Sequence, residues 1–461
     1  MKQVECRESI ETTDCPAHGG VSSRPAATLG GLAASSQLTD STSRVLQGHL
    51  ATVENHLNKG IIPFWFARAL DTQYGGFLTN FDEQGKALPC QEKYVNTQCR
   101  LIWWFSTLKR RFPQMSDAAE MASHGVDFLI KNFWDEKYGG FYWKVKRDGS
   151  ELDAAKIVYG ESYCIYALSE YYLATGDKRG LDYATKTFDL LQRYCADTQY
   201  GGYLENVNRD WGPEAGGFAG GDRKGLDTHM HLMESFTTLY AATGDELHRR
   251  KLLQVINLIC DKMIDKATGC GLNQFDLAFH SLPAISIKRT WNGERLGEQP
   301  ANPVDTTSYG HNVELKYLMQ MALNTAHKED DSYKSIHRRL LDHAVKHGVD
   351  WEYGGIFRDG LRATGEPIVF EKEFWQHSES LVAFLDGYEQ FHEPLYLQAF
   401  GKVWQFVQDF MIIKEVGEWR TLLDRFGKPI DANIGNPWKV SYHTGRSMLE
   451  CRERLMRLLD S

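Results

Sequence analysis

The sequence predicts an all-α fold in which six helix pairs form a ring, with short β-hairpin turns at one end. The first observation is a recurring turn, because the letters YGG begin at Tyr74, Tyr138, Tyr200 and Tyr353. The first three turns follow one another at intervals of roughly 63 residues, which is the length of a supersecondary unit. The second observation is that apolar residues between the turns have the spacing of helices.

Helical spacing is clear after the first two turns. The apolar residues there are Leu101, Trp104, Phe105 and Leu108, then Ile165, Leu168, Tyr171 and Tyr172. Each interval has room for two helices, so we expect one helix pair per repeat, with the turn before its second helix. Polar and aromatic residues alternate inside the turns, as in FLTNFDEQG and FYWKVKRDG, which predicts short hairpins closed by glycine.

Two weaker turns complete the set. They are GCGLNQFD near Gly269 and VGEWRTLLDRFGK from Val416. The interval between Tyr200 and Tyr353 fits two repeats and an insertion, which makes six turns in all. The insertion, from Lys266 to Gly310, has few helical signals, and segments of this kind are usually functional lids or disordered.

The repeats predict a single domain over residues 43–461. Residues 1–42 are rich in Ser, Thr, Gly and Ala, which predicts a disordered extension. The first twenty residues carry acidic side chains and lack an apolar core, so we expect neither a signal peptide nor a transit peptide.

Composition excludes several classes of partner. The net charge is -9 and no Lys/Arg-rich tract is present, which argues against nucleic acid. No run of about 18 apolar residues exists, so no membrane span is expected. The nine Cys include no CxxC pair, which favours reduced thiols and a cytoplasmic protein. We expect a small uncharged partner, and a monomer or homodimer.

Polar residues stand at the start of five predicted second helices. They are Arg100; Asp227, His231 and Glu234; His311 and Glu314; Trp375, His377 and Glu379; Trp438 and His443. A single His, Arg or Trp of this kind is more often structural, but helices at equivalent places in a ring point their starts at a common centre. Each of the two i,i+3 pairs, His231 with Glu234 and His311 with Glu314, shares a helix face. The Trp rings could stack on sugar rings.

The motifs THMHLMES, YGHNVE and WKVSYH, in this order, resemble the N-acylglucosamine 2-epimerase superfamily, and most closely its cellobiose and mannose 2-epimerase branch. The resemblance covers everything except the N-terminal extension. It implies an (α/α)6 barrel and epimerisation of a sugar at C2 without a cofactor. It also implies that Arg100, His231, His311 and His443 are active-site residues and that Glu234, Glu314, Trp375 and Trp438 contact the substrate.

Inversion at C2 requires ring opening, removal of the proton beside the carbonyl, and return of a proton to the opposite face. Imidazole, with an ordinary pKa of about 6.5, can both accept and donate a proton near neutrality. We therefore expect His311 and His443 to exchange the proton. Arg100 would stabilise the enediolate, and His231 would assist ring opening or bind the carbonyl oxygen.

Two residues depart from the pattern of the cellobiose epimerases, which usually have Gln where His377 stands and Asn where Asp227 stands. We expect both residues and Glu379 to bind substrate. Because the insertion before His311 would narrow the cleft, we expect interconversion of glucose and mannose. Cellobiose 2-epimerase and N-acylglucosamine 2-epimerase remain alternatives.

Three other functions compete with epimerisation. An aldose-ketose isomerase such as mannose isomerase would use the same enediolate. An inverting (α/α)6 glycosidase would need two carboxylates, which Glu234, Glu314 or Glu379 could supply. A sugar-binding protein without catalysis would keep only the Trp residues. We expect no metal, because Cys or clustered Asp would be needed to complete a site, although a di-metal site is conceivable.

Overall fold

The structure of the protein is a computed structural model that describes residues 40–297, 303–328 and 331–461. Most of the predicted N-terminal extension, residues 1–39, lies outside this part. The first described helix, α1 (Asp40–His56), includes residue 43, so the predicted boundary at residue 43 falls inside a helix. Within the described residues, no helix combines the length and the apolar character that crossing a membrane would require.

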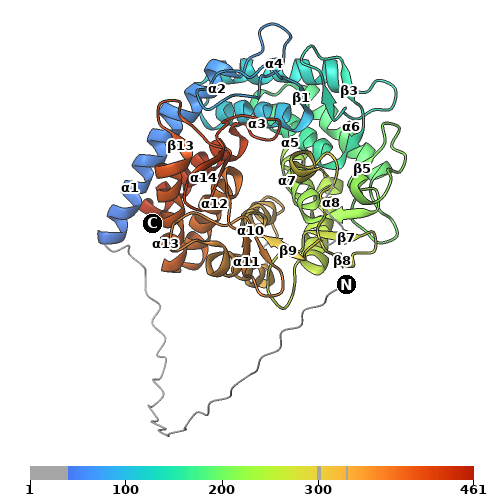
Figure 1. Cartoon of the computed structure of the whole chain (residues 1–461). Helices are drawn as coiled ribbons and strands as arrows, with labels where there is room; N and C mark the ends of the chain where they lie inside the picture. Colours follow the sequence, from blue (N-terminus) through green and yellow to red (C-terminus); the bar gives the residue numbers. More distant parts are fainter. Residues whose placement is uncertain (1–39, 298–302, 329–330) are drawn as a thin grey trace, which may run out of the picture. The chain divides into compact units, whose positions relative to one another are not determined.

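Six helices form the inner wall of a ring (Figure 1). They are α3 (Val95–Arg111), α5 (Val158–Thr175), α7 (Leu226–Thr243), α10 (Tyr309–Thr325), α12 (Phe374–Phe391) and α14 (Ser441–Asp460). Each contacts the next in this order, and α14 contacts α3, so the ring closes. Every residue of α5 from Val158 to Tyr171 is buried, as expected for a helix with neighbours on all sides.

A second layer of helices packs on the outside of the inner ring. It comprises α1, α2 (Ile62–Arg68), α4 (Ser116–Phe133), α6 (Lys178–Tyr194), α8 (Glu246–Leu258), α11 (Asp331–His343) and α13 (Pro394–Phe406). These helices bury one face only. In α6 the buried residues recur at helical spacing: Gly180, Ala184, Thr187, Phe188 and Leu191. The predicted pairing of helices is therefore confirmed.

Shorter helical pieces complete the connections. Single π-helical turns follow several outer helices: η1 (Leu57–Ile61), η3 (Ile259–Met263), η4 (Ala344–Gly348) and η5 (Val407–Met411). A 3-10 turn, η2 (Gly217–Ala219), and a short helix, α9 (Trp291–Leu296), lie in the longer loops. Helix α9 belongs to the predicted insertion before α10.

The six predicted turns are present and share one geometry. Each has glycine at positive φ: Gly75 and Gly76, Gly139 and Gly140, Gly201 and Gly202, Gly269, Gly354 and Gly355, and Gly417. Antiparallel pairing closes each turn, as between Leu70 and Phe77. A Cβ atom on Gly140 would lie 2.5 Å from Trp211, so glycine is required there for space as well as for φ.

Small antiparallel sheets join neighbouring repeats at the turn end. They are β1 (Lys93–Tyr94) with β2 (Lys144–Val145) and β3 (Glu151–Asp153); β4 (Lys156–Ile157) with β5 (Asn206–Val207); β6 (Arg223–Gly225) with β7 (Gln274–Asp276) and β8 (Ser281–Leu282); β9 (Thr306–Ser308) with β10 (Asp359–Leu361) and β11 (Pro367–Val369); β12 (Lys372–Glu373) with β15 (Leu422–Leu423) and β16 (Pro429–Asp431); and β13 (Ile412–Ile413) with β14 (Glu418–Trp419). In most of them, a strand directly before one inner helix pairs with the hairpin of the next repeat, as Lys93 pairs with Val145. The sheets thus fix where each inner helix begins.

A buried ion pair anchors five of the six turns. The pairs are Lys93 with Asp71 at 3.0 Å, Lys156 with Asp135 at 3.3 Å, Lys224 with Asp197 at 2.6 Å, Lys372 with Asp350 at 3.1 Å and Lys439 with Glu418 at 3.2 Å. Each Lys stands two positions before the first residue of an inner helix, and each carboxylate lies in or beside the turn. A buried charge must be paired, so this contact holds the turn against the helix start. In the fourth repeat Thr307 occupies the Lys position.

Candidate active site

The starts of the inner helices surround a cavity of about 430 Å³ at the turn end of the ring. Most of the predicted site residues line this cavity: Arg100, Asp227, His231, His311, Glu314, Trp375, Trp438 and His443. Glu234 and Glu379 lie behind the wall, where they bond to His231 and His443. The structure therefore brings ten of the predicted residues into one site.

Arg100 presents a buried charge that no carboxylate neutralises. Its Nη1 donates to the carbonyl oxygen of Trp438 at 2.6 Å, and its Nη2 donates to the hydroxyls of Tyr159 at 2.7 Å and Tyr163 at 2.9 Å. Among the described residues, no Asp or Glu lies within ion-pair distance of it. Burial acts to lower the pKa of Arg100, but the neighbouring tyrosine hydroxyls outweigh it and raise the pKa. The guanidinium stays charged and is suited to an anion in the cavity.

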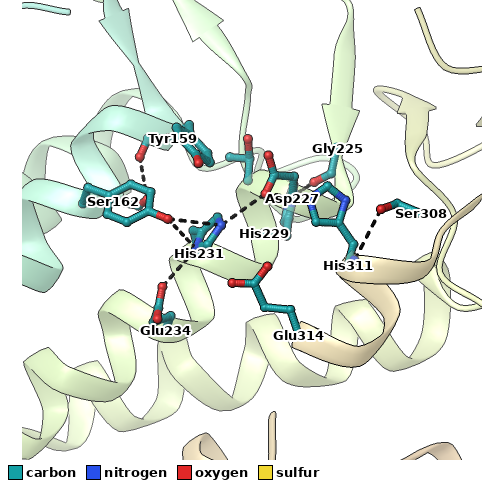
Figure 2. Close-up of polar contacts among 12 residues, drawn as sticks. Tyr159, Ser162, Gly225, Asp227, His229, His231, Glu234, Ser308, His311 and Glu314 are labelled. Carbon is teal, nitrogen blue, oxygen red and sulfur yellow. Dashed lines mark hydrogen bonds and ion pairs between the residues drawn. The ribbon is translucent and has the colours of Figure 1, made fainter. Parts of the chain in front are cut away.

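His231 is held in its protonated form by two carboxylates. Its Nδ1 donates to Glu234 Oε2 at 2.9 Å, and its Nε2 lies 3.2 Å from Asp227 Oδ1 (Figure 2). Burial acts to lower the pKa of His231, but Asp227 and Glu234 outweigh it and raise the pKa to about 10. An imidazolium at this place can donate a hydrogen bond to a sugar oxygen.

His311 lies at the first turn of α10, on the other side of Asp227. Its Nε2 is 3.5 Å from Asp227 Oδ1, and its ring centroid is 4.7 Å from that of Trp375. The side chain of Ser308 accepts a hydrogen bond from the backbone N–H of His311, which caps the helix (Figure 2). Burial lowers the pKa of His311 below its ordinary value, so the imidazole is uncharged at neutral pH when no substrate is bound.

His443 is a neutral imidazole with one nitrogen fixed. Its Nδ1 donates to Glu379 Oε1 at 2.5 Å. Burial acts to raise the pKa of Glu379, but Arg446 and His443 outweigh it, so this carboxylate is ionised. Burial lowers the pKa of His443, and since Nδ1 carries the proton, Nε2 keeps its lone pair. That is the arrangement a general base requires.

Glu314 lines the cavity as an acid. Arg446 Nη2 donates to its Oε1 at 2.7 Å. Burial and the negative charge of Glu379 raise its pKa to about 8. Glu314 can therefore donate a hydrogen bond from the cavity wall at neutral pH.

The structure does not bring His377 to the cavity, although it was predicted to bind substrate. Its side chain is fully buried, its Nε2 accepts from the backbone N–H of Ile356 at 3.1 Å, and its Nδ1 donates to the carbonyl of Glu373. Equivalent residues bond four of the other five turns in the same way: Gln98 to Phe77, Glu161 to Phe141, His229 to Tyr203 and Asn312 to Gly271. His377 therefore holds a turn in place, which is the role of the residue at this position in other repeats.

Sequence reasoning missed the tyrosines that orient Arg100, Tyr159 and Tyr163. Tyr163 also lies 3.3 Å from His231 Nδ1. A repeat alignment would have found it, because one polar side chain stands seven residues after each Lys position: Arg100, Tyr163, His231, Glu314, Glu379 and Arg446. Trp291 was also missed. It lines the cavity from α9 and donates its indole N–H to Glu373.

One group of side chains in the described part of the chain has the spacing of metal ligands. Glu314, Glu379 and His443 offer atoms within 4.8 Å of one another. Arg446 Nη2, however, lies 2.7 Å from Glu314 and 2.8 Å from Glu379. A guanidinium thus already supplies the positive charge at these carboxylates, and we assign no metal to them.

A ring of six helix pairs around a polar cavity defines an (α/α)6-barrel protein. The profile described as N-acylglucosamine 2-epimerase (GlcNAc 2-epimerase) matches residues 75–447, and the chain belongs to this family. The predicted resemblance and fold class are confirmed.

Individual relatives carry related names. A cellobiose 2-epimerase of Dictyoglomus turgidum is 28% identical over 408 residues, which cover 87% of this chain and 97% of that protein. A D-mannose isomerase of Marinomonas mediterranea is 25% identical over 415 residues, with 88% and 97% covered. The solved structure of a cellobiose 2-epimerase from Spirochaeta thermophila has a TM-score of 0.80 at 26% identity, and the match covers 91% of this chain and 100% of that one.

Proposed function

We propose that this protein is a carbohydrate epimerase that interconverts glucose and mannose by inversion at C2. One observation carries the proposal: two neutral histidines, His311 and His443, approach the same indole ring in one cavity. Their ring centroids lie 4.7 Å and 6.1 Å from that of Trp375. A sugar bound beside Trp375 would lie close to both imidazoles, and we propose that they act on opposite faces of its C2 atom.

The reaction can be followed through these groups. After the ring opens, one histidine removes the C2 proton, and the electron pair of the C2–H bond forms the C1–C2 double bond of an enediolate. The negative charge moves to O1, where Arg100 and protonated His231 stabilise it. The second histidine, which enters this step carrying a proton taken up from solvent, returns that proton to the opposite face of C2. The first histidine then releases the proton it removed to solvent.

Each proposed base has a carboxylate that stabilises its protonated form. Glu379 bonds to His443 at 2.5 Å, and Asp227 lies 3.5 Å from His311. Either histidine can therefore hold the proton while the other is neutral, which epimerisation in both directions requires. Glu234 acts on His231 in the same way, although the sequence predicts it as a contact to the substrate.

The segment before α10 supports a monosaccharide as substrate. Apolar residues from it line the cavity: Ala284, Ile285, Ile287, Trp291, Leu296 and Val304. We infer that these side chains leave too little room for the second sugar of cellobiose. The names of the relatives support the reaction class, and the choice of glucose and mannose rests on this segment. The predicted cytoplasmic location and the monomer or homodimer state stay predictions.

Proton NMR of mannose and glucose incubated with the protein in deuterium oxide tests the proposal. We expect each sugar to give the other, with deuterium at C2 of the product, because the returned proton comes from a base that exchanges with solvent. Fructose with label at C1 as the main product would identify an aldose-ketose isomerase. Cleavage of a disaccharide without label at carbon would identify a glycosidase. Equal turnover of cellobiose would refute the role of the segment.

A further inference from the structure

A single buried guanidinium lies behind the cavity wall. Arg446 of α14 does not line the cavity, and its side chain is only 4% exposed. Its Nη1 donates to Glu234 Oε1 at 2.5 Å and to the Tyr442 hydroxyl. Its Nη2 donates to Glu314 at 2.7 Å and lies 2.8 Å from Glu379. Three carboxylates from three inner helices, α7, α10 and α12, therefore meet at one side chain.

Each of these three side chains either lines the cavity or bonds a residue that lines it. Glu234 uses its other oxygen to bond His231, and Glu379 bonds His443. Glu314 is itself part of the cavity wall. Arg446 is thus one residue away from two proposed catalytic imidazoles and in contact with a third cavity group.

We infer that Arg446 is a positioning residue for the proposed epimerase, an inference that rests on the proposed function. Its planar fork holds the three carboxylates at fixed distances, and through them it fixes the ring orientations of His231 and His443. A Lys side chain has one ammonium and cannot direct donors to three carboxylates in a plane. The charge of Arg446 also offsets the buried negative charges of Glu234 and Glu379.

The alternative is that Arg446 only stabilises the barrel, and the same helix provides a matched control. Arg454 lies eight residues further along α14, is equally buried, and pairs with Asp386 at 3.0 Å and with Glu450. None of these three residues lines the cavity. Arg454 therefore shares the burial and the ion pairs of Arg446 without its connection to the site.

The test compares Arg446→Lys with Arg454→Lys in the full chain, by kcat and KM for mannose. We expect Arg446→Lys to lower kcat by about 10²-fold, because small displacements of reacting groups have effects of that size. Its KM should stay within about twofold of wild type, since the cavity lining is unchanged. Arg454→Lys should lower the melting temperature and leave kcat nearly unaltered. Equal kcat values for the two variants would overturn the inference and leave the epimerase function standing.

A second variant tests the inference if Arg446→Lys does not fold, and NMR tests it independently of turnover. If Arg446→Lys does not fold, Tyr442→Phe removes the hydroxyl that accepts from Arg446 and donates to Glu234, and a smaller loss of kcat at constant KM is expected.

NMR of the His443 ring reports on the position of this side chain without turnover. It therefore tests the role of Arg446 even if the wild-type protein epimerises neither hexose and the proposed function fails. We expect the Nδ1–H resonance of wild type to move in Arg446→Lys and not in Arg454→Lys. An unmoved resonance would overturn the inference.

Discussion

His377 and His443 are alike in residue type, burial and neutrality, yet they do different things. Each is buried in the first turn of an inner helix, and burial lowers the pKa of both. His443 stands four residues after Lys439 and lines the cavity, whereas His377 stands five residues after Lys372 and bonds a turn. One residue along a helix rotates a side chain by about 100°. Position within the repeat, rather than residue type, therefore decides which side chains can act on a substrate.

The largest effect is expected at the cavity position itself. His443→Gln keeps a hydrogen-bond donor for Glu379 but removes the basic nitrogen. General acid or base catalysis contributes up to about 10⁴-fold, so we expect kcat for epimerisation to fall by about 10³-fold or more. Turnover measured by NMR, with a circular dichroism spectrum as a check of folding, tests this. A variant with near wild-type kcat would mean that His443 does not move the proton.

The same contrast occurs on α3, where Arg100 lines the cavity and Gln98 bonds the backbone of Phe77. Arg100→Met should lower kcat by about 10²-fold, because one donor to a developing oxyanion has an effect of that size. Stability should be kept, since the wild-type charge has no carboxylate partner within the described part of the chain and burying it is unfavourable. Gln98→His, which introduces the residue used at two other turns, should leave kcat unaltered. Thermal melts and kcat of both variants decide the matter, and a destabilised Arg100→Met variant with full kcat would contradict the assignment.

Position within the repeat also explains which features of the fold and the site could be predicted from the sequence. The six turns and the helix pairs could be predicted because glycine at positive φ leaves a recurring mark in the sequence. The assignment of His377 could not be made, because it depends on where a helix begins to within one residue. That point is set by sheets between repeats, such as β12 with β15, which pair residues about 50 positions apart. Tyr159 and Tyr163 were missed because aromatic residues in an apolar helix resemble ordinary core.

A smaller effect is expected at Asp227, two residues before the turn-bonding His229 on α7. The pKa of His231 is raised from 6.5 to about 10. The stability that protonated His231 contributes is therefore complete below pH 6.5 and is lost as the pH rises towards about 10. Asp227→Asn removes one of the two carboxylates responsible, so this loss should begin and end at lower pH.

Activity should follow the same direction, because the imidazolium is the form that stabilises the enediolate. For Asp227→Asn we expect kcat to fall by about 10-fold at pH 7 and the alkaline limb of kcat to move to lower pH. The other acidic side chains that face His231, the ionised Glu234 and the protonated Glu314, stay in place. His229→Asn, which introduces the residue that Asn312 supplies at the fourth turn, should not move the limb. Identical pH profiles for wild type and Asp227→Asn would show that this carboxylate does not govern His231.

The smallest effect is expected for His377→Gln, which makes the fifth repeat like the first. Gln98 accepts from the backbone N–H of Phe77 and also donates to its carbonyl, so a Gln side chain is able to hold a turn of this shape. A Gln at 377 can accept from Ile356 in the same way, although it loses the ring contact with Phe406. We expect kcat and KM within about twofold of wild type and a loss of unfolding free energy of about 1 kcal/mol. His377→Ala leaves the Ile356 N–H without its partner and should cost more stability, again without a specific change in KM. A rise in KM for mannose in His377→Gln at unaltered stability would mean that this side chain reaches the sugar, and position within the repeat would then not separate the two histidines.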